Sequence, residues 1–282
     1  MIIFKTVQSI GKVLSKLILE NKKIGFVPTM GALHNGHLSL IEQSKKQADI
    51  TVCSIFVNPT QFNDQTDFQK YPVTIEHDIL LLEEAGCDVL FLPSVHEMYP
   101  QGTALKQPYD LGFLETLLEG KYRPGHFQGV CQVVHRLLSI VKPQVLFLGQ
   151  KDYQQCMVIS KMIELEALPV ELILGPTHRE NSGLAMSSRN MRLSDEGKQK
   201  AVAIFNSMQY IKEHITQEDV EALQKKSIDQ LLKAGFDSVD YIAICNAHTL
   251  APIHTYQPGK KLVVLVAAFI EGVRLIDNLM IN

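Results

Sequence analysis

Apolar segments that lack polar alternation recur through the first 176 residues, and they constrain the fold more than any other feature of the sequence. A strand that is apolar on both faces is covered on both faces, as in parallel sheets with helices on each side. Amphipathic stretches with apolar residues at helical spacing separate these segments. We expect strands at 24–27, 50–57, 89–92, 145–148 and 170–174, helices at 126–141 and 153–165, a helix that starts at His37 or Leu38, and a helix capped by Thr74. The sequence thus predicts an α/β fold built on a parallel sheet.

The pattern changes in the last hundred or so residues, where helical segments are followed by strands. Helices are expected from Ser194 and over 218–234, and strands at 239–245, 261–269 and 273–280. Helices followed by strands favour a small α+β domain. We therefore predict two domains, residues 1–176 and 177–282, with the boundary near Pro176–Thr177.

The composition excludes several classes of protein. Lys and Arg total 27 against 30 for Asp and Glu, a formal net charge of −3, so no general field attracts nucleic acid. The N-terminal segment lacks the apolar run of a signal peptide, and the most apolar stretch, 262–270, is too short to span a bilayer. The five cysteines are scattered and lie mostly in apolar runs, which is typical of buried, reduced thiols. A soluble cytoplasmic protein without nucleic-acid or membrane partners is expected.

Polar residues and glycines collect where the predicted strands end, at 28–31, 58–61 and 149–152. Ligands of open α/β sheets bind beyond these carboxyl ends. Lys151 is suited to hold phosphate as a point charge, and Asp152 to accept a bond from a ribose hydroxyl or to fix the lysine. Gln61 and Gln155 are candidates for recognising a polar organic substrate. The alternative for each is an ordinary surface side chain, and a salt bridge at a strand end contributes little energy.

The strongest local motif is the segment 31–37 (GALHNGH), an H-x-G-H element between a strand and a helix. Its glycines let a ligand approach the backbone, and the helix N-terminus presents N–H groups to phosphate. His34 and His37 are spaced to face one phosphate chain, where donors stabilise the transfer of a nucleotidyl group. Two surface or capping histidines are the alternative interpretation, and a zinc site lacks a third ligand nearby.

A second motif, Met186-Ser187-Ser188-Arg189, lies in a loop rich in Gly and Ser near the predicted domain boundary. A mobile loop with hydroxyl groups and a cation can close over a triphosphate, although alone such a loop is usually a solvated turn. Together with H-x-G-H after the first strand, it resembles the HIGH and KMSKS elements of class I aminoacyl-tRNA synthetases and related nucleotidylyltransferases.

Longer segments resemble the pantoate–β-alanine ligase (pantothenate synthetase) family, in order and along nearly the whole chain. They are 26–37 (FVPTMGALHNGH), 57–62 (VNPTQF), 122–129 (YRPGHFQG), 148–155 (LGQKDYQQ), 183–190 (GLAMSSRN) and 274–278 (RLIDN). The resemblance implies a Rossmann-like ATP- and pantoate-binding domain, a small C-terminal lid domain and a cytoplasmic homodimer. It also implies a ligase that uses ATP and Mg²⁺ to form pantoyl-adenylate and pyrophosphate, and then joins pantoate to β-alanine with release of AMP.

The same resemblance implies a role for each matching position. His37 is catalytic, with His34, Lys151 and Arg189 in the same chemistry. The resemblance implies that Gln61, Gln155 and Asn58 bind substrate and that Asp78 binds magnesium. Arg123 and His126 belong to a family motif but receive no role. ATP contacts are implied for Met30, Gly31, Ala32, Leu33, His34, Asn35, Gly36, His37, Gly149, Gln150, Lys151, Asp152, His178, Met186, Ser187, Ser188 and Arg189.

The sequence departs from the family pattern at Gln150, His178 and His77. Family members usually carry Glu in place of Gln150 and a small aliphatic residue in place of His178. Some members carry an acidic residue in place of His77, so the histidine here weakens the case for a magnesium site with two carboxylates. Three alternatives remain open, namely a nucleotidylyltransferase acting on a phosphorylated substrate, a free-standing synthetase core, and a non-catalytic nucleotide sensor with the same fold.

Overall fold

The computed structural model describes residues 1–63 and 65–281, and its internal contacts divide the chain into two compact units. The first unit comprises Met1–Gln150 and Gln154–Pro176. The second comprises Lys151–Tyr153 and the chain from Thr177 onward. Each unit has a hydrophobic core of its own, and we describe them separately.

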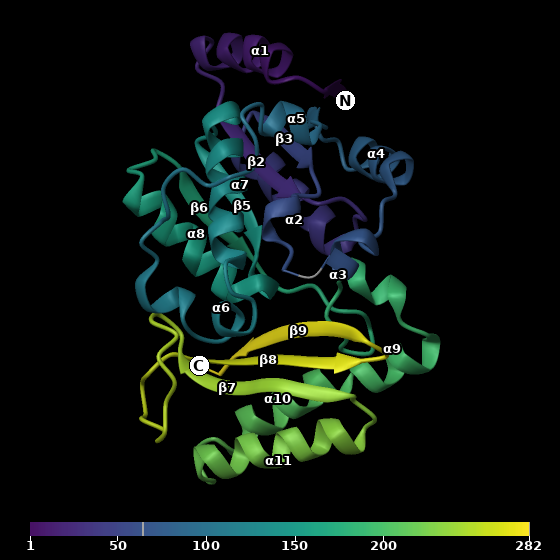
Figure 1. Ribbon diagram of the computed structural model, residues 1–282, viewed down its shortest axis with the longest axis vertical. Coiled ribbons are helices and arrows are strands. Elements are labelled where there is room, and N and C mark those ends of the chain that lie inside the picture. Colours follow the sequence, from purple (N-terminus) through teal and green to yellow (C-terminus); the bar gives the residue numbers. More distant parts are fainter. Residues whose placement is uncertain (64, 282) are drawn as a thin grey trace. The chain divides into compact units, whose positions relative to one another are not determined.

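The first unit is built on a six-stranded sheet of order β1-β4-β3-β2-β5-β6 in which every pair is parallel (Figure 1). The strands are β1 Ile2–Phe4, β2 Ile24–Thr29, β3 Ile50–Ile55, β4 Val89–Phe91, β5 Val145–Gly149 and β6 Glu171–Gly175. The predicted parallel α/β, Rossmann-like fold is confirmed. The prediction missed β1, because the strand has only three residues and its Ile2 and Ile3 are exposed, so burial leaves little pattern in its sequence.

Helices cover both faces of this sheet. On one face, the helices α1 (Val7–Leu19), α7 (His126–Val141) and α8 (Tyr153–Leu165) share a core cluster with Phe26 and Val52. On the other, α2 (Asn35–Gln47) and α4 (Ile75–Glu84) share a cluster with Val27 and Cys53. Neighbouring residues of one strand therefore enter opposite cores, which is why these strands are apolar throughout. Shorter elements are α3 Gln65–Gln69, α5 Val95–Met98, α6 Glu119–Tyr122, η1 Pro59–Gln61, η2 Gly112–Glu115 and η3 Gln150–Asp152.

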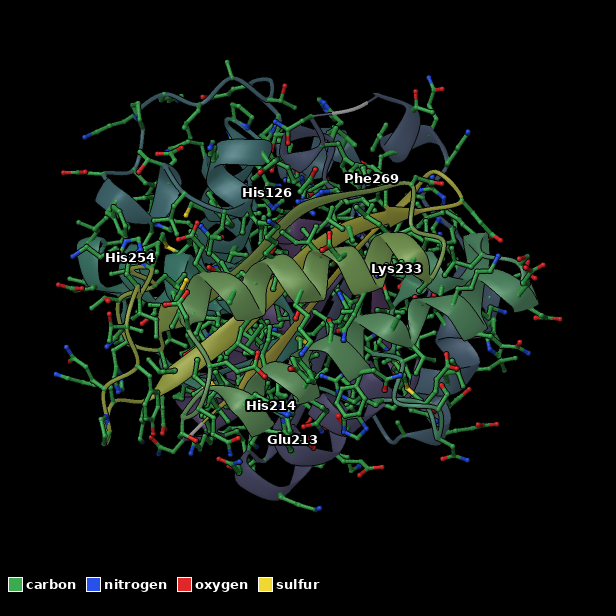
Figure 2. All side chains as sticks on the ribbon, turned by 90° about the horizontal axis from the view of Figure 1, so that it is seen from below. His126, Glu213, His214, Lys233, His254 and Phe269 are labelled. Carbon is green, nitrogen blue, oxygen red and sulfur yellow. The ribbon has the colours of Figure 1, made fainter. Side chains whose placement is uncertain are left out.

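The second unit is a three-stranded antiparallel sheet of order β7-β8-β9, packed against helices. Its strands are β7 Ser238–Asn246, β8 Leu262–Ile270 and β9 Val273–Met280, and its helical elements are η4 Ser188–Arg192, α9 Asp195–Ala201, α10 Ala203–His214 and α11 Val220–Lys233. Figure 2 shows α11 lying across the sheet with Lys233 at its end. The predicted α+β composition is confirmed, whereas α10 was not predicted as a separate helix. None of the helices in the described part of the chain is long and apolar enough to cross a membrane.

The five cysteines are buried and free, as predicted. Burial raises the pKa of Cys87, Cys131 and Cys245 to about 12. These thiols therefore stay protonated near neutral pH and behave as small apolar side chains.

Candidate active site

The chain turns between β2 and α2 through two successive residues with positive φ, Gly31 at +83° and Ala32 at +48°. A Cβ on Gly31 would lie 3.0 Å from Oδ2 of Asp78 and 3.1 Å from a methyl carbon of Ile55. Backbone conformation and close contact therefore both require glycine at this position. The turn directs the backbone N–H groups of the next residues toward Asp78.

Asp78 closes this turn from the first helical turn of α4. Its Oδ2 accepts a hydrogen bond from the Ala32 N–H at 2.9 Å, and its Oδ1 accepts one from the Leu33 N–H at 2.8 Å. The Thr74 hydroxyl adds a third bond to Oδ1 at 3.1 Å. The Asp78 side chain is fully buried, so these three bonds replace the water that an ionised carboxylate needs.

The geometry bears on two predictions about the turn, and both remain predictions. Asp78 was predicted as a magnesium ligand, but both of its oxygens are buried and bonded to the protein's own donors. Within residues 1–63 and 65–281, no group of three or more His, Cys, Asp and Glu side chains is placed to hold a metal ion. Ala32 and Leu33 were predicted to contact ATP. Their N–H groups donate to Asp78, so a contact with the nucleotide would use other atoms of these residues.

We expect Asp78→Asn to lower the melting temperature by about 5 °C or more, because the variant loses the charge of a buried, triply bonded carboxylate. Product formation should slow, and raising the Mg²⁺ concentration should not restore it. The matched control is Asp49→Asn, since Asp49 also accepts a backbone N–H in this unit but is exposed. Recovery of activity with added Mg²⁺ would return Asp78 to the metal site.

The two histidines of the H-x-G-H element form a reciprocal cap at the start of α2. His34 is the N-cap, and its Nδ1 accepts the Gly36 N–H at 3.2 Å. His37 accepts the His34 N–H on its own Nδ1 at 3.3 Å. The helix begins at Asn35, earlier than predicted. The prediction missed this start because histidine is an unusual residue in a capping box.

These caps fix the tautomer of both rings. An Nδ1 atom that accepts a hydrogen bond carries no proton, so each neutral imidazole of His34 and His37 holds its proton on Nε2. The ring centroids lie 4.1 Å apart. The alternative of capping histidines and the catalytic interpretation are therefore compatible, since capping uses Nδ1 and places the N–H donor of each ring on Nε2.

A polar cluster beside β3 holds Gln61. Its backbone carbonyl accepts hydrogen bonds from His126 Nδ1 at 2.7 Å and from Arg123 at 3.3 Å. Arg123 also reaches His126 Nε2 at 3.2 Å, and since arginine only donates, His126 is neutral with its proton on Nδ1. The Gln61 amide donates to the Met30 sulfur at 2.8 Å. Arg123 and His126, which had no predicted role, thus hold Gln61 beside the residue that follows β2.

Asn58 was predicted to bind substrate, and that role stays a prediction. The residue is 1% exposed, and its amide donates to the Thr60 hydroxyl at 2.9 Å and to the Gly129 carbonyl at 3.2 Å. The Tyr99 hydroxyl donates to its Oδ1 at 2.8 Å, and burial raises the pKa of Tyr99 to about 12, which keeps that donor protonated. This saturation argues against direct contact between Asn58 and substrate. Asn58 orders the loop that presents Gln61.

The carboxyl end of β5 leads through η3 into α8. Gly149, Gln150, Lys151 and Asp152 lie here and are all half-buried. Two adjacent glutamines then differ in role. Gln154 is buried and binds the backbone of Leu114, Leu117 and Glu119. Gln155 is half-buried and points from a different side of α8, so it remains the candidate for substrate.

In the second unit, the segment 178–190 forms a short loop that places the serine-and-arginine motif. The Met186 N–H donates to the His178 carbonyl at 2.9 Å, and Arg179 and Ala185 form an antiparallel bridge. Ser187 caps η4 by accepting the Arg189 N–H at 3.3 Å. The buried Ser188 lies within η4. The motif is thus an ordered turn with a 3-10 helix.

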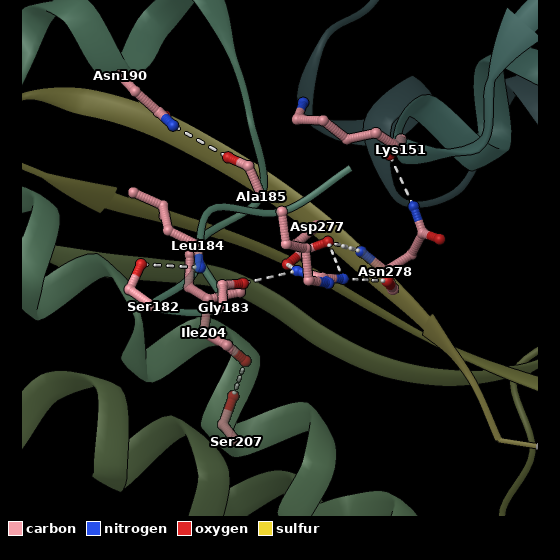
Figure 3. Close-up of polar contacts among 11 residues, drawn as sticks. Lys151, Ser182, Gly183, Leu184, Ala185, Asn190, Ile204, Ser207, Asp277 and Asn278 are labelled. Carbon is pink, nitrogen blue, oxygen red and sulfur yellow. Dashed lines mark hydrogen bonds and ion pairs between the residues drawn. The ribbon is translucent and has the colours of Figure 1, made fainter. Parts of the chain in front are cut away.

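The second unit also contains a small pocket with a cationic lining. Figure 3 shows polar contacts of several of its residues, among them Lys151, Asn190 and Asp277. The polar lining residues of the pocket are Lys151, Ser187, Arg189, Asn190, Arg274 and Asp277. Arg274 pairs with Asp240 at 2.7 Å, and Asp277 pairs with Arg179. The cations Lys151, Arg189 and Arg274 outnumber the carboxylate of Asp277 in the lining, so its formal charge is positive, as a site for an anion requires.

The structure therefore groups the predicted residues in two sets. In the first unit, Met30, His34, His37 and Gln61 surround the ends of β2 and β3. In the second, Lys151, Ser187 and Arg189 line one pocket. Sequence reasoning missed Tyr99, Arg179, Asp277 and Asn278. Asp277 and Asn278 lie in the segment 274–278 that resembles the family, and this resemblance was the only sign of them in the sequence.

Comparisons with known proteins identify the family of the chain. A family model described as pantoate-beta-alanine ligase matches residues 2–280. The pantothenate synthetase of Cytophaga hutchinsonii is 46% identical over 286 residues, covering 100% of this chain and 99% of the relative. That of Caldicellulosiruptor bescii is 42% identical over 284 residues, covering 100% and 99%.

Solved structures of the same kind superpose on the chain. Pantothenate synthetase from Thermus thermophilus has a TM-score of 0.91 at 40% identity and covers 100% of this chain and 99% of its own. Pantoate-beta-alanine ligase from Francisella tularensis, complexed with beta-gamma ATP and beta-alanine, has a TM-score of 0.83 at 38% identity and covers 100% and 98%. The chain therefore belongs to the pantoate–β-alanine ligase family and is an enzyme.

Proposed function

We propose that this enzyme condenses pantoate with β-alanine in two steps. Pantoate attacks the α-phosphorus of ATP to give pantoyl-adenylate and pyrophosphate, and the amine of β-alanine then displaces AMP. The observation that carries the proposal is the H-x-G-H turn, whose two imidazoles are fixed with donors on Nε2. The names and ligands of the relatives supply the substrates.

The first step is needed because a carboxylate is a poor electrophile. Adenylation joins a carboxylate oxygen to the α-phosphorus, and the resulting acyl-phosphate anhydride has AMP as a good leaving group. Negative charge builds on the α-phosphate oxygens and on the departing pyrophosphate during this step. His34 and His37 donate hydrogen bonds from Nε2 to these oxygens, and Lys151 and Arg189 of the second unit contribute cations to the same reaction.

Gln61 and Gln155 recognise pantoate in this proposal. Pantoate carries two hydroxyl groups beside its carboxylate, and a side-chain amide can both donate to and accept from such groups. The Gln61 backbone is held by His126 and Arg123, so little rotational freedom is lost when its amide meets the substrate.

Magnesium enters with the nucleotide in this proposal. The ion usually keeps several waters and binds through substrate phosphates, where it neutralises phosphate charge. Asp78, the predicted ligand, does not suit the ion, because its oxygens already accept hydrogen bonds from the protein. We therefore assign no residue to magnesium.

The organisation of the enzyme is part of the proposal. The first unit serves as the ATP- and pantoate-binding domain and the second as the lid domain, and the active enzyme is a cytoplasmic homodimer. Family resemblance supports these assignments. Light scattering of the purified chain tests the dimer, and a monomer with full activity would refute it.

The decisive experiment measures AMP from Mg-ATP and pantoate, with and without β-alanine, together with exchange of labelled pyrophosphate into ATP. Steady AMP release should require all three substrates, whereas pyrophosphate exchange should need only ATP and pantoate. ATP turnover without pantoate, or no AMP under any combination, would refute the ligase and favour a nucleotidylyltransferase or a sensor.

A further inference from the structure

The backbone carbonyl of Lys151 accepts a hydrogen bond from the side-chain amide of Asn278 at 2.7 Å. The two residues are 127 positions apart, and Asn278 lies on β9 with 3% of its surface exposed. Figure 3 shows the Lys151 side chain running away from this carbonyl, so the bond holds the backbone and leaves the ammonium group to the pocket.

Asn278 is itself held by an ion pair. The Arg179 guanidinium donates two hydrogen bonds to the Asp277 carboxylate, at 2.5 and 3.0 Å. It also donates one to the Asn278 carbonyl at 3.2 Å. The same guanidinium lies 4.3 Å from the centre of the Phe205 ring. Asp277 is buried, and it accepts the Asn278 N–H at 2.7 Å. These contacts fix the backbone from which the Asn278 amide projects.

A second bond holds the other end of the same short segment. The Tyr153 hydroxyl donates to the Ala247 carbonyl at 2.7 Å. Both bonds tie Lys151–Tyr153 to the second unit, although Gln150 and Gln154 on either side belong to the first. Within the second unit, two hydrogen bonds therefore hold the short segment that carries Lys151.

We propose that Asn278, held by Arg179 and Asp277, is a positioning residue that sets the place of Lys151 for adenylation. The proposal rests on the proposed function of Lys151. Lysine is a point charge on a flexible stem, so its reach is determined by where its backbone starts. A displacement of about 1 Å at a reacting group costs up to about 100-fold in rate.

Burial of Asn278 supports this role over a merely structural one. A buried amide costs free energy unless it is hydrogen-bonded, and an apolar side chain on this strand would avoid that cost. The register partner of Asn278 on β8, Leu265, is apolar and buried, and its neighbour on β9, Asp277, is the buried partner of Arg179. The buried amide of Asn278 therefore lies where it can bond the backbone of Lys151, the proposed phosphate-binding residue.

The test is a double-mutant cycle in the full-length enzyme, measured by pyrophosphate exchange. Asn278→Leu should slow adenylation by about 10- to 100-fold, and Asn278→Gln, which keeps an amide, should recover part of it. Lys151→Ala alone should cost about 100- to 1,000-fold. In the Lys151→Ala background, Asn278→Leu should change the rate by less than about twofold, because Asn278 acts only through the lysine.

The control for general destabilisation is Gln224→Leu. Gln224 also donates a side-chain amide to a backbone carbonyl, that of Ile242, within the second unit. Loss of this hydrogen bond in Gln224→Leu should lower the melting temperature and leave the adenylation rate unchanged. If Asn278→Leu leaves adenylation unchanged, or if its effect multiplies with that of Lys151→Ala, the positioning role is overturned. If Lys151→Ala itself adenylates normally, the proposed role of Lys151 fails instead.

Discussion

Replacing His37 with alanine is expected to slow the formation of the acyl-adenylate by about 100- to 1,000-fold, the usual cost of one transition-state donor. The attack of β-alanine on supplied pantoyl-adenylate should keep most of its rate. The physical reason lies in the cap on α2. Because His37 Nδ1 accepts the His34 N–H, the ring has one tautomer and one orientation, and the direction of its Nε2 proton is set before the substrate binds.

Single-turnover measurement of acyl-adenylate formation separates the two steps. His37→Gln should retain more activity than His37→Ala, since glutamine keeps a donor but loses the cap geometry. His96→Ala is the matched control, because His96 is exposed in α5 of the same unit. A His37→Ala enzyme with normal adenylation and a slow second step would show that the histidine serves the amine and not the phosphate.

Gln61→Ala is expected to lower kcat/KM for pantoate by about 10- to 100-fold, which corresponds to the loss of a hydrogen bond to a charged or strongly polar group. The KM for ATP should change by less than about threefold. The structure supports this selectivity because His126 and Arg123 hold the backbone of Gln61, and truncation of its side chain leaves those bonds in place.

Steady-state kinetics with each substrate varied in turn provide the measurement. Gln47→Ala controls for a general loss of glutamine, since Gln47 is exposed at the end of α2. An unchanged dependence on pantoate, or an equal loss for ATP, would remove Gln61 from the pantoate site and leave Gln155 as the candidate.

The fold was predictable because burial on both faces of the sheet determines the residue type at consecutive positions. Phe26 and Val27 are both fully buried, yet they enter different cores, so the strand carries no alternation and only a doubly covered sheet explains it. The start of α2 was misplaced because its cap is a histidine.

The site was predictable only where its residues are close in sequence. His34 and His37 are three positions apart, so their proximity follows from the helix. Arg179 and Asp277 are separated by 98 positions, and Tyr99 and Asn58 by 41. No local pattern joins such pairs. The burial of Asn58 and Asp78 was not predicted for a related reason, since polarity is visible in the sequence but burial among hydrogen-bond partners is not.

The Asp78 carboxylate under the H-x-G-H turn affects the free energy of nucleotide binding. Asp78 accepts hydrogen bonds from the N–H groups of Ala32 and Leu33, in the way that a bound anion occupies a nest of amides. The protein's own carboxylate therefore shapes the turn. Nucleotide binding loses none of its free energy to shaping this loop, and the amides of both residues should exchange slowly with solvent whether ATP is present or not.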